Sequence, residues 1–237
     1  MGTTRFNYIT NDNPFKNERI FFPMSSIDNT IVFVKNKLKE AEGGHDWFHI
    51  ERVYKNALLI AQTEICNLTV VKLGALLHDI ADSKFHNGDE QIGPKIARQF
   101  LEQEQLDKAT IEHVIAIIEN LSFKGGNFKS KFHSKELEIV QDADRLDAIG
   151  AIGIARTFNF GGFKNRSLYD PSISPKMNMT KEEYKSSTAP TINHFYEKLL
   201  LLKDKMNTET AKKIAANRHA FMERFLAQFY AEWEGEA

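Results

Sequence analysis

The chain has 237 residues, of which 42% are hydrophobic, so it can form one large domain with a substantial core. Its 31 basic and 32 acidic residues give a net charge of −1, which argues against a nucleic-acid polymer or a membrane surface as partner. The single cysteine, Cys66, excludes an intramolecular disulfide and fits a reducing compartment. The sequence shows no signal-peptide pattern and no apolar run near the roughly 20 residues that span a bilayer, so we expect a cytoplasmic protein.

Residues 1–24 contain Pro14 and Pro23 without a clear period, which predicts an irregular arm before a single domain over 25–237. Hydrophobic residues then recur at helical spacing along nearly the whole chain, which predicts an all-α helical bundle. Gly43 and Gly44 are expected to end the first helix. The elements expected after it are helices at 47–63, 68–82, 89–103 and 106–121, a loop at 122–134, a helix at 135–158, a loop at 159–178, and helices at 181–206 and 208–234, the last with Thr208 as candidate N-cap.

Polar residues inside the most apolar helix are the first sign of chemistry. Segment 68–82, LTVVKLGALLHDIAD, is apolar on nearly every side but places His78 and Asp79 in its middle. A buried, ionised aspartate is costly unless it is paired or binds a metal. Asp82 follows His78 by four residues and is expected on the same helix face.

A second group of acids lies in VQDADRLDAIG, where Asp144 and Asp147 are three residues apart and are expected to point in one direction. Asp142 is expected to face solvent or to pair with a base. His49, near the start of the 47–63 helix, adds a further imidazole. Two imidazoles and two carboxylates suit a divalent transition metal such as Mn, Co, Ni, Fe or Zn better than calcium, with Mg kept as a further candidate. Four protein ligands leave positions for water and substrate.

His49, the His78-Asp79 pair and Asp144 reproduce the H…HD…D pattern of the HD-domain superfamily of metal-dependent phosphohydrolases. The strings GHDWFHIERV, ALLHDIAD, DADRLDAIGAIGIARTF and INHFYEKLLLLKDKMNT resemble the bacterial YedJ/YpgQ-like branch of this superfamily. The resemblance covers about residues 25–232. It implies a single HD-domain bundle in which these four residues bind one divalent metal ion.

The resemblance also implies roles for neighbouring residues. Asp82 falls where related HD nucleotidases carry a general acid or base, although an exposed carboxylate at a helix end is the alternative. His45 and Asp46 would line the mouth of the site or orient His49, unless His45 is merely exposed and Asp46 caps the helix. Asp147 would support the ligands or hold a substrate sugar. The catalytic candidates are therefore Asp82, His45 and Asp147.

Basic residues of the long loops are candidates for phosphate contacts, although a solvated surface explains any single one. Arg145 adjoins a ligand and would contact phosphate or pair with an acid. Histidines between the HD pair and the last aspartate could hold a second metal, but His86 is too close to His78, and we expect His113 and His133 to be surface or core residues. The phosphate candidates are Lys124, Lys129, Lys131, Arg145, Lys164 and Arg166.

The resemblance implies a phosphohydrolase acting on a small phosphorylated metabolite, with a nucleotide the expected substrate. Hydrolysis of nucleoside triphosphates with release of pyrophosphate is the leading hypothesis. A 5′-nucleotidase and a regulatory module that binds metal or nucleotide with little turnover are the alternatives. Phe21 and Phe22 are expected to serve a homodimer or to pack on the domain.

Overall fold

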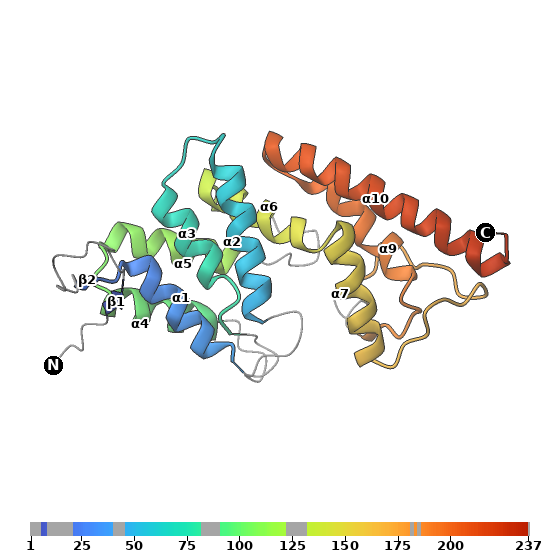
Figure 1. The fold of residues 1–237 in the computed structure, drawn as a ribbon, viewed down its shortest axis with the longest axis horizontal. Helices are drawn as coiled ribbons and strands as arrows, with labels where there is room; N and C mark the ends of the chain where they lie inside the picture. Colours follow the sequence, from blue (N-terminus) through green and yellow to red (C-terminus); the bar gives the residue numbers. More distant parts are fainter. Residues whose placement is uncertain are drawn as a thin grey trace, which may run out of the picture.

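The computed structural model describes residues 6–8, 21–39, 46–81, 91–121, 132–180, 183 and 186–236, and it confirms an all-α domain (Figure 1). Two short strands, β1 (Phe6–Tyr8) and β2 (Phe21–Pro23), pair antiparallel within the arm that the sequence predicted to be irregular. The helices are α1 (Ser26–Lys37), α2 (Trp47–Ala61), α3 (Leu68–Leu77), α4 (Ile92–Gln103), α5 (Lys108–Leu121), α6 (Lys135–Asp147), α7 (Gly150–Phe163), α9 (Asn193–Glu197), the 3-10 helix η2 (Leu199–Lys205) and α10 (Glu209–Glu234).

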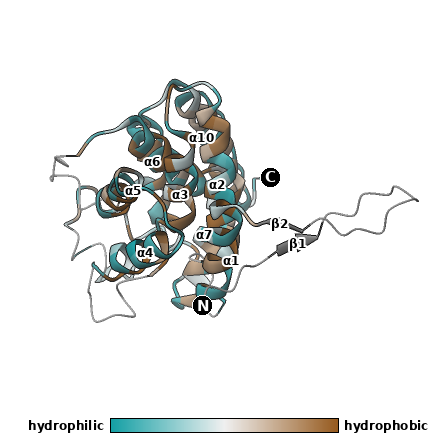
Figure 2. Cartoon of the chain, turned by 90° about the vertical axis from the view of Figure 1, so that its left-hand side faces the viewer, coloured by the Kyte–Doolittle hydropathy of each residue, from teal (hydrophilic) through white to brown (hydrophobic). Residues whose placement is uncertain are grey.

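Helix α3 is the centre of the N-terminal half, with α1, α2, α5 and α6 packed around it (Figure 2). Gly74 makes this possible because a Cβ at its position would already stand 3.4 Å from side-chain atoms of Ile117 and Val140. Helices α5 and α6 can therefore approach the α3 backbone closely. From Val70 to Leu77 every residue of α3 except Lys72 is buried, as its hydrophobic sequence predicted.

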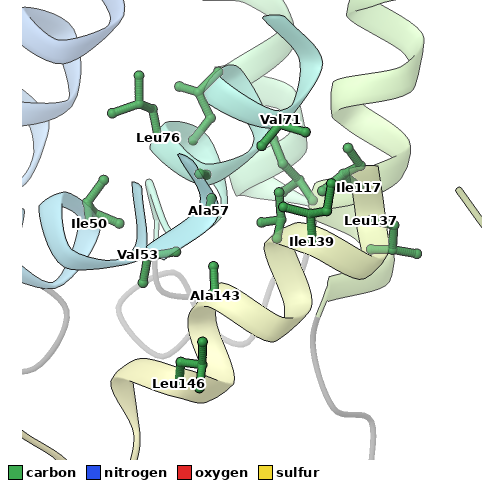
Figure 3. Close-up of a cluster of buried hydrophobic side chains, with 14 of the residues drawn as sticks. Ile50, Val53, Ala57, Val71, Leu76, Ile117, Leu137, Ile139, Ala143 and Leu146 are labelled. Atoms are coloured by element: carbon green, nitrogen blue, oxygen red, sulfur yellow. The ribbon is translucent and has the colours of Figure 1, made fainter. Parts of the chain in front are cut away.

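The core joins the helices that carry the polar residues of interest. Figure 3 shows side chains of α2, α3, α5 and α6 meeting in one cluster, with Ile50 and Val53 from α2 and Ala143 and Leu146 from α6. All four of these side chains are buried. The start of α2 and the end of α6 are thus held at fixed positions by the apolar residues beside His49 and Asp144.

The helix predicted over 135–158 is in fact two helices. Helix α6 ends at Asp147, and Gly150 begins α7 with φ +76°, a left-handed conformation that glycine adopts without strain. A Cβ at Gly150 would stand 2.9 Å from Cγ of Arg218, which packs there from α10. The break turns α7 away from the α6 axis and begins the C-terminal half of the molecule (Figure 1).

Two further helix predictions need correction. Helix α3 ends at Leu77, so His78 and Asp79 lie in the turn after the helix rather than in its middle. The helix predicted over 181–206 is not continuous: Pro190 cannot continue a helix, Lys198 adopts a non-helical backbone conformation, and α9 and η2 lie within residues 191–206. Segment 159–178 was also not all loop, since α7 extends to Phe163.

The last helix begins where the sequence predicted. The Thr208 hydroxyl accepts a hydrogen bond from the backbone N–H of Ala211 at 3.3 Å, so Thr208 is the N-cap of α10. Asp142, which we expected to face solvent or pair with a base, is fully buried and lies 3.5 Å from the base Arg145. It also accepts hydrogen bonds from the backbone N–H groups of Asn207 and Thr208. Among the described helices, none is long and apolar enough to cross a membrane.

Candidate metal centre

His49 is fixed on the first turn of α2 from two sides. Asp46 is the N-cap, and its carboxylate accepts a hydrogen bond from the His49 backbone N–H at 3.0 Å. The His49 ring is 3% exposed, and its Nδ1 lies 2.8 Å from Oδ2 of Asp147. Because a carboxylate accepts here, Nδ1 carries the proton and Nε2 keeps its lone pair.

His78 is held in the same tautomer by the end of α3. Its Nδ1 lies 2.9 Å from the carbonyl oxygen of Ala75, so Nδ1 donates and Nε2 again keeps a lone pair. The two Nε2 atoms of His49 and His78 are only 3.3 Å apart. Burial lowers the pKa of His78, which favours the neutral ring. Two lone pairs that face each other at this distance require a cation between them or a shared proton.

Two carboxylates complete the group. Oδ1 of Asp144 lies 3.6 Å from Nε2 of His49 and 3.9 Å from Nε2 of His78. Asp79 supplies a ligand atom that lies, with those of both histidines, within a group no wider than 4.8 Å. Donors bound at about 2.0–2.2 Å to one transition metal stand roughly 3 Å or more apart. The group of His49, His78 and Asp79 could therefore hold a divalent metal ion, with Asp144 beside it.

The centre is buried on its histidine side and open on its aspartate side. The Asp144 side chain is 41% exposed, in contrast to the 3% exposed side chains of His49 and His78. Solvent, and therefore a substrate, can reach the group beside Asp144. An ion held by these residues would keep room for water and substrate oxygens on this open side.

Asp147 holds the ligand His49 and is itself held by two arginines. It accepts from Arg52 at 2.6 and 3.0 Å and from Arg156 at 2.6 Å, while only 2% of its side chain is exposed. Burial alone would raise the pKa of Asp147, but hydrogen bonds from His49 and Arg52 and the charge of Arg156 hold it well below its ordinary value. These contacts favour a positioning role for Asp147 over direct contact with a substrate.

The sequence analysis missed both arginines. Arg52 follows His49 by three residues, which places it on a neighbouring part of the same helix surface. Arg156 is the one charged residue of α7, GAIGIARTFNFGGF, and this isolation was an available signal. Both were passed over because neither belongs to the ligand pattern.

The basic residues predicted to contact phosphate are distributed differently. Arg145 donates to the carbonyl oxygen of Lys205 at 2.6 Å and lies 3.5 Å from Asp142, so it pairs with an acid, one of its two expected roles. Lys164 and Arg166 follow α7 and lie over the Phe160 ring at 5.7 and 5.6 Å. Their contact with phosphate stays a prediction. Outside the described residues are His45, Asp82, Lys124, Lys129 and Lys131.

The other histidines that we considered as ligands for a second metal are placed apart. His113 bonds to the Ser134 hydroxyl at 2.9 Å and lies 3.4 Å from Glu136, and His133 is exposed. His86 lies outside the described residues. Within the described part of the chain, the cluster of three or more potential metal ligands consists of His49, His78 and Asp79.

Comparison with known proteins agrees with this geometry. The HD domain family model matches residues 47–149, a span that begins with α2 and ends just after α6. YpgQ of Bacillus subtilis (strain 168) is 38% identical over 205 residues, which cover 86% of this chain and 92% of YpgQ. The chain therefore belongs to the HD-domain family and is a metal-dependent phosphohydrolase of that superfamily.

Solved structures extend the similarity to both halves of the molecule. A Lactobacillus plantarum protein superposes with a TM-score of 0.76 at 37% identity, covering 89% of this chain and 97% of its own. An HD-superfamily hydrolase from Bacillus thuringiensis gives a TM-score of 0.70 at 45% identity, covering 88% and 96%. Bacillus subtilis YpgQ in complex with ADP gives a TM-score of 0.70 at 34% identity, covering 87% and 94%.

Proposed function

We propose that this phosphohydrolase acts on nucleoside or deoxynucleoside triphosphates and releases pyrophosphate at one divalent ion held by His49, His78, Asp79 and Asp144. The main support for a metal centre is that the Nε2 atoms of His49 and His78 lie 3.3 Å apart. The Nδ1 atoms of these rings bond instead to Asp147 and to the Ala75 carbonyl oxygen. The nucleotide is supported by the similarity to YpgQ, whose structure was solved in complex with ADP.

A divalent ion at this position would lower the pKa of a bound water and polarise a phosphoryl oxygen. The protein residues prepare the centre for it. Asp147 and the Ala75 carbonyl fix the two histidine tautomers, and Arg52 and Arg156 keep Asp147 ionised in its buried position. The ligand set therefore needs little rearrangement before a substrate enters beside Asp144.

Proton transfer and phosphate binding would come from residues around the opening. Asp82, three residues beyond Asp79, is our candidate for the acid or base that exchanges a proton with the attacking water or the leaving group. Lys164 and Arg166 are candidates for holding the phosphate chain, together with the loop lysines named from the sequence.

A substrate screen with separate product assays tests this function. Chelator-treated protein would receive Mn, Co, Ni or Mg and then nucleoside tri- and monophosphates, with pyrophosphate and inorganic phosphate measured separately. We expect metal-dependent release of pyrophosphate from triphosphates, lost in Asp82→Asn while metal binding is retained.

The other outcomes would overturn the proposal in distinct ways. Release of phosphate from monophosphates alone would identify a 5′-nucleotidase. Tight metal binding without turnover of any nucleotide would support a regulatory module. As a matched control, Asp204→Asn changes an exposed carboxylate after α9 and should leave the products and rates unchanged.

A further inference from the structure

A cavity of about 190 Å³ lies behind the metal centre, between α2, α7 and α10. Asp147 joins it to the centre, because Asp147 lines the cavity and also accepts from Nδ1 of His49, the ring nitrogen opposite the one that faces the metal ligands. None of the four proposed ligands is among its lining residues. The described residues that line the cavity are Arg52, Lys55, Asn56, Asp147, Ile152 and Arg218.

The lining carries three basic side chains and one carboxylate. The carboxylate is already engaged on its other side, where Arg156 and His49 donate to it. The net charge of the lining side chains is therefore +2. Arg156, which binds Asp147 but does not line the cavity, contributes a further positive charge nearby. The volume is several times the roughly 30 Å³ that one water occupies in the liquid, so a tetrahedral anion fits.

Arg218 is the strongest indication of an anion. It donates to the carbonyl oxygen of Leu146 and, at 3.2 Å, to the side-chain oxygen of Asn56, both of which are neutral acceptors. Burial lowers the pKa of Arg218 although the charge of Asp147 acts in the opposite direction, so its positive charge lies in a poorly solvated position. A guanidinium in such a place gains more from an anionic partner than one in water.

We propose that this cavity binds a phosphoryl dianion through Arg52, Lys55 and Arg218, at a site separate from the metal centre. The ligand is the phosphate group itself, as free phosphate or as the phosphate of a nucleotide. Because Arg52 also binds Asp147, the occupied site would change the charge around the residue that orients His49. The proposal does not depend on the reaction proposed above.

Lys55 separates this proposal from a purely structural role of the cluster. Arg52 and Arg218 would be needed in either case, to hold Asp147 and to bind the last carbonyl groups of α6. Lys55 has no such role: its side chain is 67% exposed and pairs with Glu51 at 3.2 Å on the same helix. An anion in the cavity gives Lys55 a second partner.

Calorimetric titration of metal-free, chelator-treated full-length protein with inorganic phosphate, at constant ionic strength, tests the site. We expect one binding site per chain. Lys55→Gln should weaken it about three- to fivefold, the effect of a partly exposed ion pair. Arg218→Gln should weaken it by about tenfold or more, provided its circular dichroism is unchanged. Lys213→Gln, the same change at an exposed position of α10, should have no effect.

Three results would overturn the proposal: no phosphate binding to metal-free protein, equal binding by wild type and Lys55→Gln, or equal weakening by Lys55→Gln and Lys213→Gln. A parallel titration with a nucleoside monophosphate distinguishes the source, because equal affinity identifies the bare phosphate group and tighter binding a nucleotide. No metal or turnover is involved, so a failure here leaves the proposed reaction untouched, and a failure of the substrate screen leaves this site untouched.

Discussion

Two buried carboxylates on α6, Asp142 and Asp147, stand five residues apart in very different surroundings. Asp142 faces the C-terminal half and accepts from the Asn207 N–H at 2.9 Å and from the Thr208 N–H at 2.7 Å. Burial raises the pKa of Asp142, against these hydrogen bonds, whereas the partners of Asp147 hold its pKa low. Asp147 faces two arginines and the ring of His49.

The difference shows what distinguishes a site from a structural polar cluster. The closest donors to Asp142 are neutral groups of Asn207 and Thr208, with Arg145 farther away at 3.5 Å, and none of them continues to a potential metal ligand. The chain of bonds through Asp147 instead continues to His49, whose Nε2 then meets Nε2 of His78. Burial of polar groups is common to both regions, but converging lone pairs occur at the metal centre.

The largest effect should come from Asp144→Asn, which removes a proposed ligand from the open side of the centre. Turnover should fall by at least about two orders of magnitude, more than the loss of an outer partner costs. The unfolding free energy of metal-free protein should barely change, because the side chain is 41% exposed. Steady-state rates and urea unfolding measure the two quantities. A large loss of stability with normal turnover would show that Asp144, like Asp142, stabilises the fold and does not take part in the reaction.

Asp147→Asn should weaken metal binding although Asp147 is not one of the proposed ligands. Loss of the carboxylate that fixes Nδ1 of His49 should weaken metal binding by about 10- to 100-fold. Equilibrium dialysis against Mn²⁺ measures this affinity, with Asp204→Asn as a control at an exposed carboxylate. Unchanged affinity in Asp147→Asn would show that Arg52 and Arg156 merely close a structural ion pair.

Asp142→Asn should reverse this pattern. The amide can no longer accept at both oxygens, so buried N–H groups at the start of α10 lose partners, and the unfolding free energy should fall by about 2 kcal/mol. Metal affinity should remain that of the wild type. Urea unfolding and the same dialysis test both statements. A weaker metal site in this variant would mean that the two ends of α6 are coupled.

The last prediction concerns His194 in α9, where burial lowers the pKa to about 3 and the effect appears only at acidic pH. The folded state holds this ring neutral, while the unfolded chain protonates it below about pH 6.5, so stability is lost as the pH falls from that value toward 3. Between pH 7 and pH 5 the loss should reach about 2 kcal/mol, and His194→Gln should lack it. Identical pH dependence of unfolding in the two proteins would contradict this.

The sequence singled out His78 and Asp79 as candidate ligands because they interrupt an apolar run, and the resemblance to the HD-domain superfamily completed the candidate set with His49 and Asp144. The structure brings His49, His78 and Asp79 into one group of potential ligands, with Asp144 beside it. The helices with a clear apolar stripe, such as α2 and α5, were predicted within a few residues of their bounds. Local periodicity carries this information without knowledge of the tertiary structure.

The sequence did not reveal helix breaks or side-chain pairs that depend on residues far apart in the chain. Gly150 lies in an apolar run that continues a helical pattern, and the Arg218 side chain that leaves no room for a Cβ there comes 68 positions later in the numbering. The pairing of Arg52 and Arg156 with Asp147 likewise depends on how α2, α6 and α7 meet. Pro190, by contrast, was a visible signal that the predicted 181–206 helix ignored.

The most direct test of the account is the number of metal ions bound per chain. Chelator-treated wild type, His78→Ala and His133→Ala would be titrated with Mn²⁺ while the free ion is followed by electron paramagnetic resonance. The account predicts one tight site per chain in the wild type and in His133→Ala, whose changed histidine is exposed, and none in His78→Ala. Tight binding that survives His78→Ala would contradict a centre built on the facing histidines.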